Sequence, residues 1–447
     1  MSDRNEFEKY KRILRADPML YKAVEGISGS ASSQSNLARY VIAPVLVLYT
    51  RWILKEAQKR DIHRLYFLAR DGWLMYHIAG QICKAEKLNL ECSYFYCSRY
   101  ALRAGAYRFF DDSAYEKLFL HSYRQNAHDM LCRAGLDETD REQIYDDIGY
   151  DAGKEYSIMG RKEFDEFCEK IKKSTVFREL LSRISEEAYP VTMRYIGQEG
   201  MNKHKRIGIV DLGWTGSLQY TLRKLLDSSH INTHITGFYM GMLDAPPKVP
   251  GSVYVPWLFD QADIKTKSWF AHNLMECICS APHGMTLGYK NEEGHTVPIY
   301  AKQENHSGYI EEIKRTSLEL SGKLIGHDPD STDKTGYRDK KLAVKLLKQL
   351  MYSPTYADIA VLQDYSFCDD VGEQYHRSLV QPGTGKEFRA EILPFKLKQR
   401  DKTDGFFWYC GSLKISKLHF KQIYKTGYRL TRKLIERRKL KICHSEP

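Results

Sequence analysis

The chain has 447 residues, and its hydrophobic content of 43% predicts a globular protein with a large core and two or three lobes. The net charge is +11, but residues 411–442 contain eleven Lys or Arg side chains and one acid, Glu436, a balance of +10. Because the remainder is nearly neutral and no base-reading motif occurs, nucleic acid is not an expected partner.

Ten cysteines, of which Cys277 and Cys279 are close neighbours, give neither a disulfide framework nor the paired ligand spacing of zinc. The N-terminus lacks an apolar signal core, so we expect a cytoplasmic protein.

The first predicted element is a helix that is capped by Ser35 or Asn36 and contains the longest apolar run of the chain, 41–49. This run has nine residues and includes Pro44, whereas a membrane-spanning helix needs about 20 apolar residues. The sequence therefore predicts a helix buried in a protein core rather than a membrane span.

Two apolar strands with a helix between them follow. The segment "RLYFLA" at 64–69 ends in the loop "RDG", helical spacing continues over 73–88, and "SYFYCS" at 93–98 predicts a second strand. A strand, a helix and a strand in this order are typical of a parallel, doubly wound sheet. We assign residues 1–110 to the first part of an α/β domain.

The α/β pattern is interrupted and then returns. Residues 111–201 are charged and helical with little strand signal, and we interpret them as an inserted helical lobe. Residues 202–302 form the second part of the α/β domain, with the apolar strand "RIGIVDL" and strand candidates at 235–242 and 252–259. Residues 303–447 contain a polar linker, more helix and the basic tail, and we interpret them as a helical accessory region.

A glycine-containing loop follows the strand "RIGIVDL", which ends at Asp211. After Leu212 the loop consists of Gly213, Trp214, Thr215, Gly216 and Ser217. Glycines allow close approach of the backbone, and hydroxyls beside the unpaired N–H groups of a helix start suit a phosphate. The carboxylate of Asp211 can accept hydrogen bonds from sugar hydroxyls or help to hold a metal-bound substrate. A tight turn capped by Asp211 explains the same residues, so both interpretations stay open.

A second loop of this kind follows the earlier strand. It consists of Ala69, Arg70, Asp71 and Gly72, and the arginines Arg99 and Arg103 follow the neighbouring strand. A guanidinium can make two parallel, charge-assisted hydrogen bonds to a phosphate group. Each arginine alone is typical of a surface ion pair, but three of them after two adjacent strands favour an anion site.

The loop after Asp211 resembles motifs of two enzyme families. The class I methyltransferase motif D-x-G-x-G-x-G is similar, but Thr215 replaces its middle glycine, and the following strand has no acid before Asp244 to hold a ribose. The type I phosphoribosyltransferase motif, an apolar strand ending in acid and then T-G-[GKS]-[ST], is similar to "IVDLGWTGSLQ", although Leu212 stands where that family usually has a second acid. Its earlier diphosphate loop resembles "ARDG". We rank phosphoribosyl transfer first and S-adenosylmethionine-dependent methyl transfer second.

The segments "RLYFLARDGWLM", "YCSRYALR" and "MECICSAPHGMTLGY" extend the resemblance, over about residues 37–300, to bacterial polysaccharide-cluster proteins often described as haloacid-dehalogenase-type hydrolases. Many relatives carry a phosphatase half with an early D-x-D-x-[TV] motif, which residues 1–60 lack, so we do not expect hydrolase activity. The remaining region resembles the phosphoribosyltransferase module that adds ribofuranose to surface glycans such as O-antigen or capsule. The resemblance implies a donor, 5-phosphoribosyl diphosphate, with Mg²⁺ bound through its diphosphate. It also implies a lipid-linked or growing glycan acceptor and a separate phosphatase.

The resemblance further implies roles for the loop residues. Residues 215–217 take the 5-phosphate of the donor, Arg70 takes its diphosphate, and Asp211 binds the ribose hydroxyls. The acceptor hydroxyl needs a base, and Glu276 and His283 are candidates for acceptor binding or proton removal because they bring a carboxylate and an imidazole into one short segment. A single His or Glu is more often structural, so this assignment stays open.

The basic tail alternates Lys and Arg with apolar side chains, which is typical of a segment that lies on anionic lipid. Such a contact would place the protein on the inner face of the cell membrane, beside a lipid-linked acceptor. A solvated helix face explains the pattern equally well. A non-catalytic sugar-phosphate-binding or assembly protein remains an alternative to both enzymes, because the second acid after Asp211 is missing.

Overall fold

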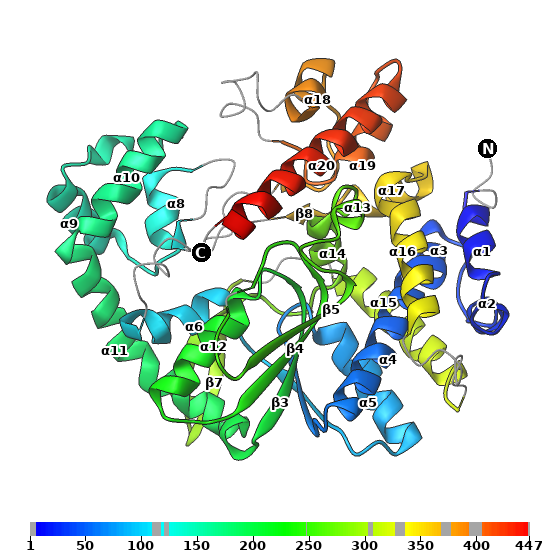
Figure 1. The fold of residues 1–447 in the computed structure, drawn as a ribbon, viewed down its shortest axis with the longest axis horizontal. Helices are drawn as coiled ribbons and strands as arrows, with labels where there is room; N and C mark the ends of the chain where they lie inside the picture. Colours follow the sequence, from blue (N-terminus) through cyan, green and yellow to red (C-terminus); the bar gives the residue numbers. More distant parts are fainter. Residues whose placement is uncertain are drawn as a thin grey trace.

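A five-stranded parallel sheet lies at the centre of the molecule (Figure 1). The computed structural model describes residues 6–109, 118–119, 125–246, 248–302, 307–326, 336–367, 377–392 and 405–445. The strand order is β2-β1-β3-β4-β5, with β1 (Arg64–Leu68), β2 (Glu91–Phe95), β3 (Arg206–Trp214), β4 (His234–Met242) and β5 (Ser252–Phe259). Each neighbouring pair is parallel. The predicted α/β class with a parallel sheet built from two separated stretches of chain is therefore confirmed.

Both faces of the sheet are buried, as is usual for parallel sheets. Side chains of consecutive residues in a strand point to opposite faces, so Leu65 and Phe67 enter one apolar cluster, while Tyr66 and Leu68 enter another. The strand β3 alternates in the same way. A shift of one residue in register would exchange these two sets of side chains, so the burial of both faces specifies the pairing of the strands.

Helices cover the sheet on both sides. The cluster that contains Leu65 also contains side chains from α4 (Ala43–Lys59), α5 (Trp73–Glu86), α15 (Ser307–Lys323) and α16 (Tyr337–Tyr352). The cluster that contains Tyr66 includes side chains from α6 (Arg99–Ala106), α11 (Thr175–Gln198) and α12 (Ser217–Ser228). The result is a layered arrangement of helices, sheet and helices.

The apolar N-terminal helix is part of this core. It runs through α3 (Ser33–Leu37), a π-helical turn (Ala38–Ile42) and α4, and it begins after the N-cap Ser32, whose hydroxyl accepts a hydrogen bond from the N–H of Ser35. The predicted N-cap, Ser35 or Asn36, lies three or four residues after the observed one. Among the described residues, Ser33–Lys59 is the helical segment long and apolar enough to cross a membrane, but 89% of its most apolar window is buried inside the protein. The prediction of a buried helix is confirmed.

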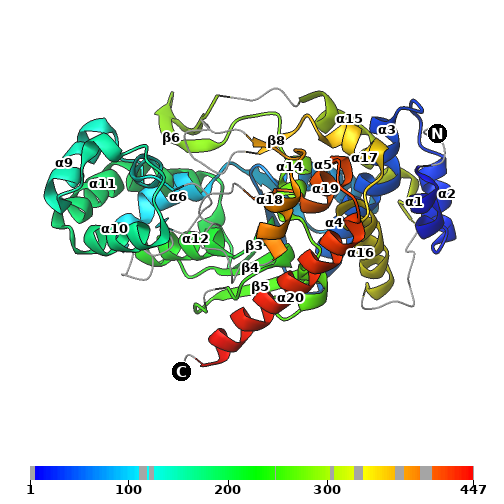
Figure 2. The same ribbon diagram turned by 90° about the horizontal axis from the view of Figure 1, so that it is seen from above.

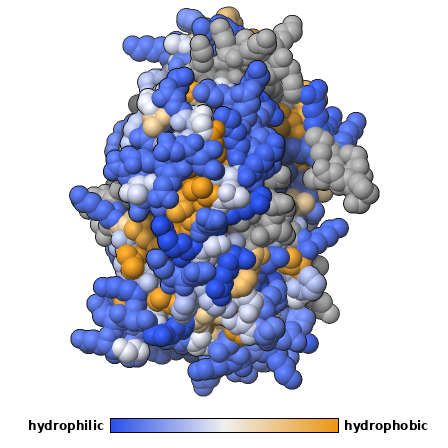
Figure 3. All heavy atoms as spheres, turned by 90° about the vertical axis from the view of Figure 1, so that its left-hand side faces the viewer, coloured by the Kyte–Doolittle hydropathy of each residue, from blue (hydrophilic) through white to orange (hydrophobic). Residues whose placement is uncertain are grey.

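A group of helices to one side of the sheet has its own apolar cluster (Figure 2). It comprises α8 (Ala127–Cys132), α9 (Glu138–Ile148), α10 (Arg161–Lys173) and the first half of α11. The surface on this side of the molecule is mostly hydrophilic, with small separate hydrophobic patches (Figure 3). Part of the predicted inserted lobe, 111–117 and 120–124, lies outside the described residues, and the predicted division of the chain into four segments stays a prediction.

One hairpin was not anticipated from the sequence. Strands β6 (Thr286–Glu292) and β7 (His295–Tyr300) are antiparallel and meet at a turn through Glu293 and Gly294. The remaining elements are α1 (Glu8–Leu14), α2 (Pro18–Glu25), α13 (Ile264–Lys267), α14 (His272–Ile278), α17 (Tyr356–Leu362), α18 (Gly385–Ile392), α19 (Tyr409–Ile415), α20 (Lys421–Ser445), β8 (Ser366–Phe367) and β9 (Arg377–Ser378). The described residues also include three 3₁₀ turns, Tyr107–Phe109, Ala152–Lys154 and Met201–Lys203.

The basic tail folds back onto the body of the protein as α20, at the carboxyl end of the sheet (Figure 1). Its Glu436 forms an ion pair of 2.5 Å with Lys267 of α13, and both side chains are 2% exposed. Its Lys439 pairs at 3.0 Å with Asp244, which follows β4, and Tyr428 stacks on Tyr409 of α19. The tail is therefore packed against the core along one face.

The buried pair predicts a clear stability effect. We expect Lys267→Met to lower the free energy of unfolding by about 3–5 kcal/mol, because it leaves the buried Glu436 carboxylate with Arg432 at 3.8 Å. Adding Glu436→Leu should recover most of this loss, since two apolar side chains then fill the site. Thermal and denaturant unfolding of the single and double variants measure the effect.

The matched control is the exposed pair Lys162 and Glu166 on α10, 3.5 Å apart. Lys162→Met should change the free energy of unfolding by about 0–1 kcal/mol. Equal losses at Lys267 and Lys162 would show that α20 is not anchored by the buried pair.

Candidate functional site

The sheet topology brings two loops together. The strands β1 and β3 are neighbours, but the chain continues from β1 toward β2 and from β3 toward β4, in opposite directions across the sheet. At such a switch point the loops at the carboxyl ends of the two strands diverge and leave a crevice in which ligands of open α/β sheets bind. These are the two segments that the sequence singled out, 69–72 and 213–217. The predicted end of the strand at Asp211 was wrong, because β3 continues to Trp214, and Gly213 and Trp214 pair with Gly241 and Met242 of β4. The name loop 213–217 is kept for this segment.

The loop after β3 depends on its glycines. Gly213 has φ +111°, and a Cβ atom there would lie 2.6 Å from the carbonyl oxygen of Gly241. Gly216 has φ +69° and is the N-cap of α12, and a Cβ there would lie 2.7 Å from the ring of Tyr254. Trp214 also has a positive φ of 79°. Both glycines are therefore required by the backbone path and by close packing.

The start of α12 suits an anion. Gly216 supplies no side-chain cap to the first turn of α12, and the hydroxyl of Thr215 donates instead to the Ser217 hydroxyl at 3.2 Å. The first N–H groups of a helix have no partner inside the helix, and the helix dipole adds partial positive charge at this end. This geometry agrees with the phosphate role that the sequence suggested for residues 215–217.

The loop after β1 is similarly tight. The N–H of Ala69 donates to the carbonyl oxygen of Phe95 in β2 at 3.0 Å, and the N–H of Gly72 donates to that of Leu68 at 2.7 Å. A Cβ atom on Gly72 would lie 2.7 Å from the same Leu68 oxygen, so no larger residue fits. Gly72 is the N-cap of α5, again without a side-chain cap. The side chains of Arg70 and Asp71 are partly exposed at this point.

Two carboxylates from the two loops meet. Asp71 forms a side-chain hydrogen bond with Asp211. Burial, followed by the charges of Asp211 and Glu276, raises the pKa of Asp71 well above its usual range, while Arg70 and Arg99 act in the opposite direction. The Asp71 carboxyl group is therefore harder to ionise than an exposed carboxyl group.

Asp211 is held by several groups. The hydroxyl of Tyr49 donates to its backbone carbonyl oxygen at 3.0 Å. Burial raises the pKa of its carboxyl group to about 6, against the opposing effects of Arg99, of the Leu212 and Gly213 N–H groups, and of the hydrogen bond from Asp71. The pair thus loses a proton as the pH rises through about 6.

Cations surround the two acids. Arg70 and Arg99 both act electrostatically on Asp71, and Arg99 is the first residue of α6 after its N-cap Ser98. Arg103 lies one turn further along α6, and burial, then the charges of Arg99 and Arg133, lower its pKa to about 10. The three arginines predicted from the sequence therefore lie on the two elements that border the crevice.

The tail helix α20 adds further cations that sequence reasoning missed. His272, at the start of α14, has a pKa lowered to about 4, first by burial and then by the charges of Arg432, Lys439 and Arg99, with Asp244 acting in the opposite direction. Two of these cations belong to α20. Nothing in the sequence could have placed them here, since they lie more than two hundred residues after the loop at Asp211 and the contact is tertiary.

Glu276 and His283 both lie beside the crevice, and their side chains have different hydrogen-bond partners. Glu276 accepts a hydrogen bond of 2.6 Å from the indole N–H of Trp214. His283 donates from Nδ1 to the carbonyl oxygen of Gly284 at 2.8 Å and accepts at Nε2 from the hydroxyl of Tyr94 at 2.7 Å. Burial lowers the pKa of His283, and Arg70 contributes to the same shift, so the ring is neutral.

The neighbouring cysteines are buried in the core. Cys277 follows Glu276 on α14, and Cys279 is the C-cap of this helix. Burial raises the pKa of both thiols. Within the described ranges, no three His, Cys, Asp or Glu side chains lie close enough together to hold a metal ion.

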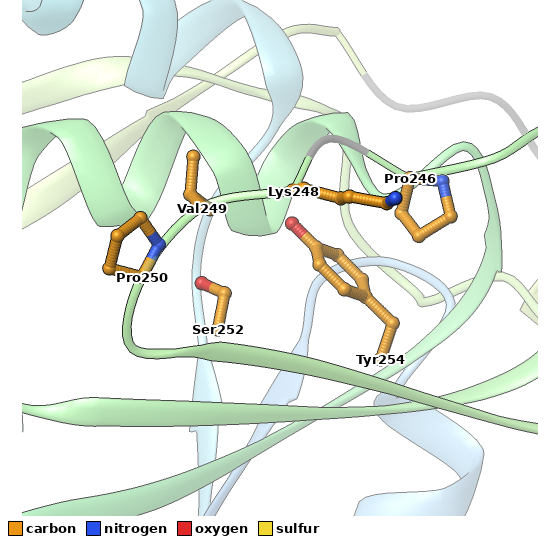
Figure 4. A pocket seen from close by; sticks show the side chains of 6 residues that line it. All are labelled: Pro246, Lys248, Val249, Pro250, Ser252 and Tyr254. Carbon is orange, nitrogen blue, oxygen red and sulfur yellow. The ribbon is translucent and has the colours of Figure 1, made fainter. Parts of the chain in front are cut away.

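A groove of about 330 Å³ lies beside the start of α12. It is lined by Pro246, Lys248, Val249, Pro250, Ser252 and Tyr254, which come from the segment between β4 and β5 and from β5 itself (Figure 4). The ring of Tyr254 and the side chain of Pro246 pack against Gly216. The groove is thus adjacent to the loop 213–217 but separate from the acid pair.

No protein-family model and no curated protein matches this chain.

The acid pair predicts a pH-dependent change in stability. The folded-state pKa of Asp211, about 6, is above its ordinary value of 3.8, so the stabilising effect of its proton is complete below pH 4 and is lost as the pH rises through 6. Asp211→Asn cannot ionise. The free energy of unfolding of the variant, relative to that of the parent, should therefore increase by about 1–3 kcal/mol between pH 4 and pH 7, since one pKa unit corresponds to about 1.4 kcal/mol. The melting temperature of the variant should rise relative to that of the parent over the same range.

Melting curves by circular dichroism across this pH range provide the measurement. Asp165→Asn is the control, because this carboxylate lies exposed on α10. A difference between Asp211→Asn and the parent that stays constant with pH would contradict a shared proton at the crevice.

Proposed function

We propose that the chain is a phosphoribosyltransferase-type glycosyltransferase, which moves 5-phosphoribofuranosyl from 5-phosphoribosyl diphosphate to a hydroxyl group of a surface-glycan acceptor and releases diphosphate. The observation that carries the proposal is the convergence of loops 69–72 and 213–217 at the switch point of a parallel sheet. The donor carries anionic groups at both ends of one ribose. Two anion-binding loops on adjacent strands, with carboxylates between them, match that distribution of charge.

The two loops would bind the two ends of the donor. The uncapped start of α12, with the hydroxyls of Thr215 and Ser217, receives the 5-phosphate. The guanidinium of Arg70 and the N–H groups around Gly72 receive the diphosphate, and Arg99 and Arg103 of α6 add positive charge there. The diphosphate gains negative charge as the C1 bond breaks, so these cations stabilise the transition state more than the ground state.

The phosphoribosyltransferase motif usually has a second acid after the first, where this chain has Leu212, and Asp71 can take the place of that acid. Leu212 is fully buried in the core, on the opposite face of β3, so an acid at that position would have no access to the crevice. Asp71 reaches Asp211 from the other loop and makes a hydrogen bond to it. In this proposal the pair Asp71 and Asp211 binds the ribose hydroxyls, which replace the hydrogen bond between the two acids.

The same pair fits the Mg²⁺ that accompanies such donors. Mg²⁺ prefers oxygen ligands and is usually bound through one or two carboxylates together with substrate phosphates. Asp71 and Asp211 provide two adjacent carboxyl groups beside the proposed diphosphate position. When bound, Mg²⁺ neutralises charge on the departing diphosphate.

Glu276 is the stronger candidate for the base. Both ring nitrogens of His283 already form hydrogen bonds, to Gly284 and Tyr94, so this ring would have to break one of them before it could accept a proton. The Glu276 carboxylate is oriented by the Trp214 indole, and a carboxylate so oriented can accept the proton of an acceptor hydroxyl. We therefore assign proton removal to Glu276 and positioning to His283.

Substitution of the two principal residues tests the proposal. We expect Arg70→Ala and Asp211→Asn each to reduce turnover at least about a hundredfold while the fold is kept. Loss of Arg70 should act mainly on kcat, because it contacts the departing group, whereas loss of Asp211 should also raise the donor KM. The assay follows diphosphate release from 5-phosphoribosyl diphosphate with Mg²⁺ and candidate glycan acceptors.

Arg161→Ala is the control for these substitutions, since this arginine is exposed on α10.

Binding calorimetry separates the proposed transferase from the two alternative functions. Binding of S-adenosylmethionine without binding of the phosphoribosyl donor would favour the methyltransferase. Donor binding without diphosphate release for any acceptor would favour a sugar-phosphate-binding or assembly protein.

We also propose that the outer face of α20 contacts the inner face of the cell membrane. Four apolar side chains of this region, Phe420, Ile423, Leu430 and Leu434, are 51–79% exposed. They alternate with the Lys and Arg side chains that give the tail its charge of +10. An exposed apolar stripe flanked by cations matches the surface of an anionic bilayer, where a lipid-linked acceptor would be located.

Vesicle co-sedimentation tests this contact. The double variant Ile423→Asp, Leu430→Asp should lose at least about tenfold in binding to anionic vesicles, since it removes apolar area and adds negative charge. Met19→Asp is the matched control, because Met19 is an exposed apolar side chain on α2. Unchanged binding of the double variant would exclude this face as the membrane contact.

A further inference from the structure

A separate cluster of ionisable side chains lies in the helical lobe, on and beside α8. His128 and Cys132 are one helical turn apart and therefore share a face of this helix. The Sγ atom of Cys132 lies 3.6 Å from Nε2 and 3.9 Å from Nδ1 of His128, so the sulfur lies against the imidazole ring, and Nδ1 lies 3.0 Å from a carboxylate oxygen of Asp129. A thiol, an imidazole and a carboxylate thus form a continuous chain of contacts.

The carboxylate fixes the state of the imidazole. The side-chain amide of Asn126 donates to Asp129 at 2.9 Å, and the Asp129 N–H donates back to Asn126 at 2.7 Å, so the carboxylate is held in place. Asp129 and His128 are 9% and 8% exposed. Because a carboxylate oxygen accepts the hydrogen bond, Nδ1 carries the hydrogen in its contact with Asp129, and the imidazole is held beside the Cys132 sulfur.

A cation from the next helix faces the same sulfur. The guanidinium of Arg141 in α9 donates to the Cys132 Sγ at 3.5 Å. Glu155 lies 3.7 Å from the Arg141 Nε, the ring of Tyr156 lies 4.6 Å from that of the histidine, and Tyr100 of α6 interacts electrostatically with the thiol. Cys132 itself is partly exposed. A guanidinium and an imidazole beside an accessible sulfur are the features that stabilise a thiolate.

From this geometry we infer that Cys132 is a nucleophilic thiol and a site of covalent exchange with small-molecule disulfides. The Cys132 thiol releases its proton to solvent, with the thiolate stabilised beside the Arg141 guanidinium and the His128 ring, and the Cys132 sulfur attacks one sulfur of the disulfide. A mixed disulfide forms at Cys132 as the original S–S bond breaks, and the other half leaves as a thiolate that takes up the proton. The inference does not depend on the proposed transferase activity.

Reaction of the native full-length chain with an aromatic disulfide reagent, 5,5′-dithiobis(2-nitrobenzoic acid), tests the site, with the labelled residues identified by peptide mass analysis. At pH 7 we expect Cys132 to react at least about tenfold faster than the model thiol glutathione, with a rate that reaches its plateau below the usual thiol pKa of about 8.5. Cys132→Ser should abolish this fast phase. Cys168→Ser, which removes a buried thiol of the same lobe, should leave it unchanged.

Substitution of the histidine shows whether it activates the sulfur. His128→Gln should slow labelling of Cys132 at least about tenfold and move the midpoint of its pH profile upward, and Asp129→Asn should do the same to a smaller extent. If either variant folds poorly, the pH profile of labelling in the parent protein still shows whether the pKa of the Cys132 thiol is lowered. Labelling of Cys132 at the glutathione rate, or a parent profile with its midpoint near 8.5, would overturn the inference.

Discussion

The pairing of β1 with β3 is the constraint on which the candidate site depends. These strands are separated by more than a hundred residues of chain, yet Leu65 lies opposite Gly208 and Phe67 opposite Val210. The apolar side chains on both faces of each strand fix this register, because any other register would expose them. As a result, the loops that follow Leu68 and Asp211 end at the same place. The core of the protein thereby determines which polar side chains meet.

The crevice holds charges at a cost in stability. Two carboxyl groups share a proton there, and a third carboxylate, Glu276, lies close by with several arginines. Burial disfavours the ionised form of each acid, so the unliganded protein is less stable at neutral pH than it would be with apolar side chains. A ligand that brings hydroxyl groups or a cation to Asp71 and Asp211 would reduce the free-energy cost of burying these carboxyl groups in their ionised form. Binding and stability are therefore linked at this site.

The sequence predicted the parts of the fold that depend on local pattern. Uninterrupted apolar runs that end in glycine loops identified β1 and β3, since strands buried on both faces read as continuous hydrophobic stretches. The hairpin β6–β7 escaped notice because its outer residues are charged and its faces are unequally buried. The adjacency of Asp71 and Asp211 could not be deduced, because it follows from the strand order. That order is decided by packing between distant segments, not by the residues of either loop.

The tail shows why composition alone is an incomplete guide. Its charge and apolar spacing suggested a surface segment, and the outer face of α20 fits that description. The inner face does not, since Glu436 enters a buried ion pair with Lys267, and Arg432 and Lys439 act electrostatically on His272. One rigid helix thus carries exposed apolar side chains on one face and charges beside the crevice on another. If the outer face lies on a bilayer, the buried pair at Lys267 fixes the orientation of the crevice relative to the lipid, so that an acceptor anchored in that bilayer approaches the site from a defined side.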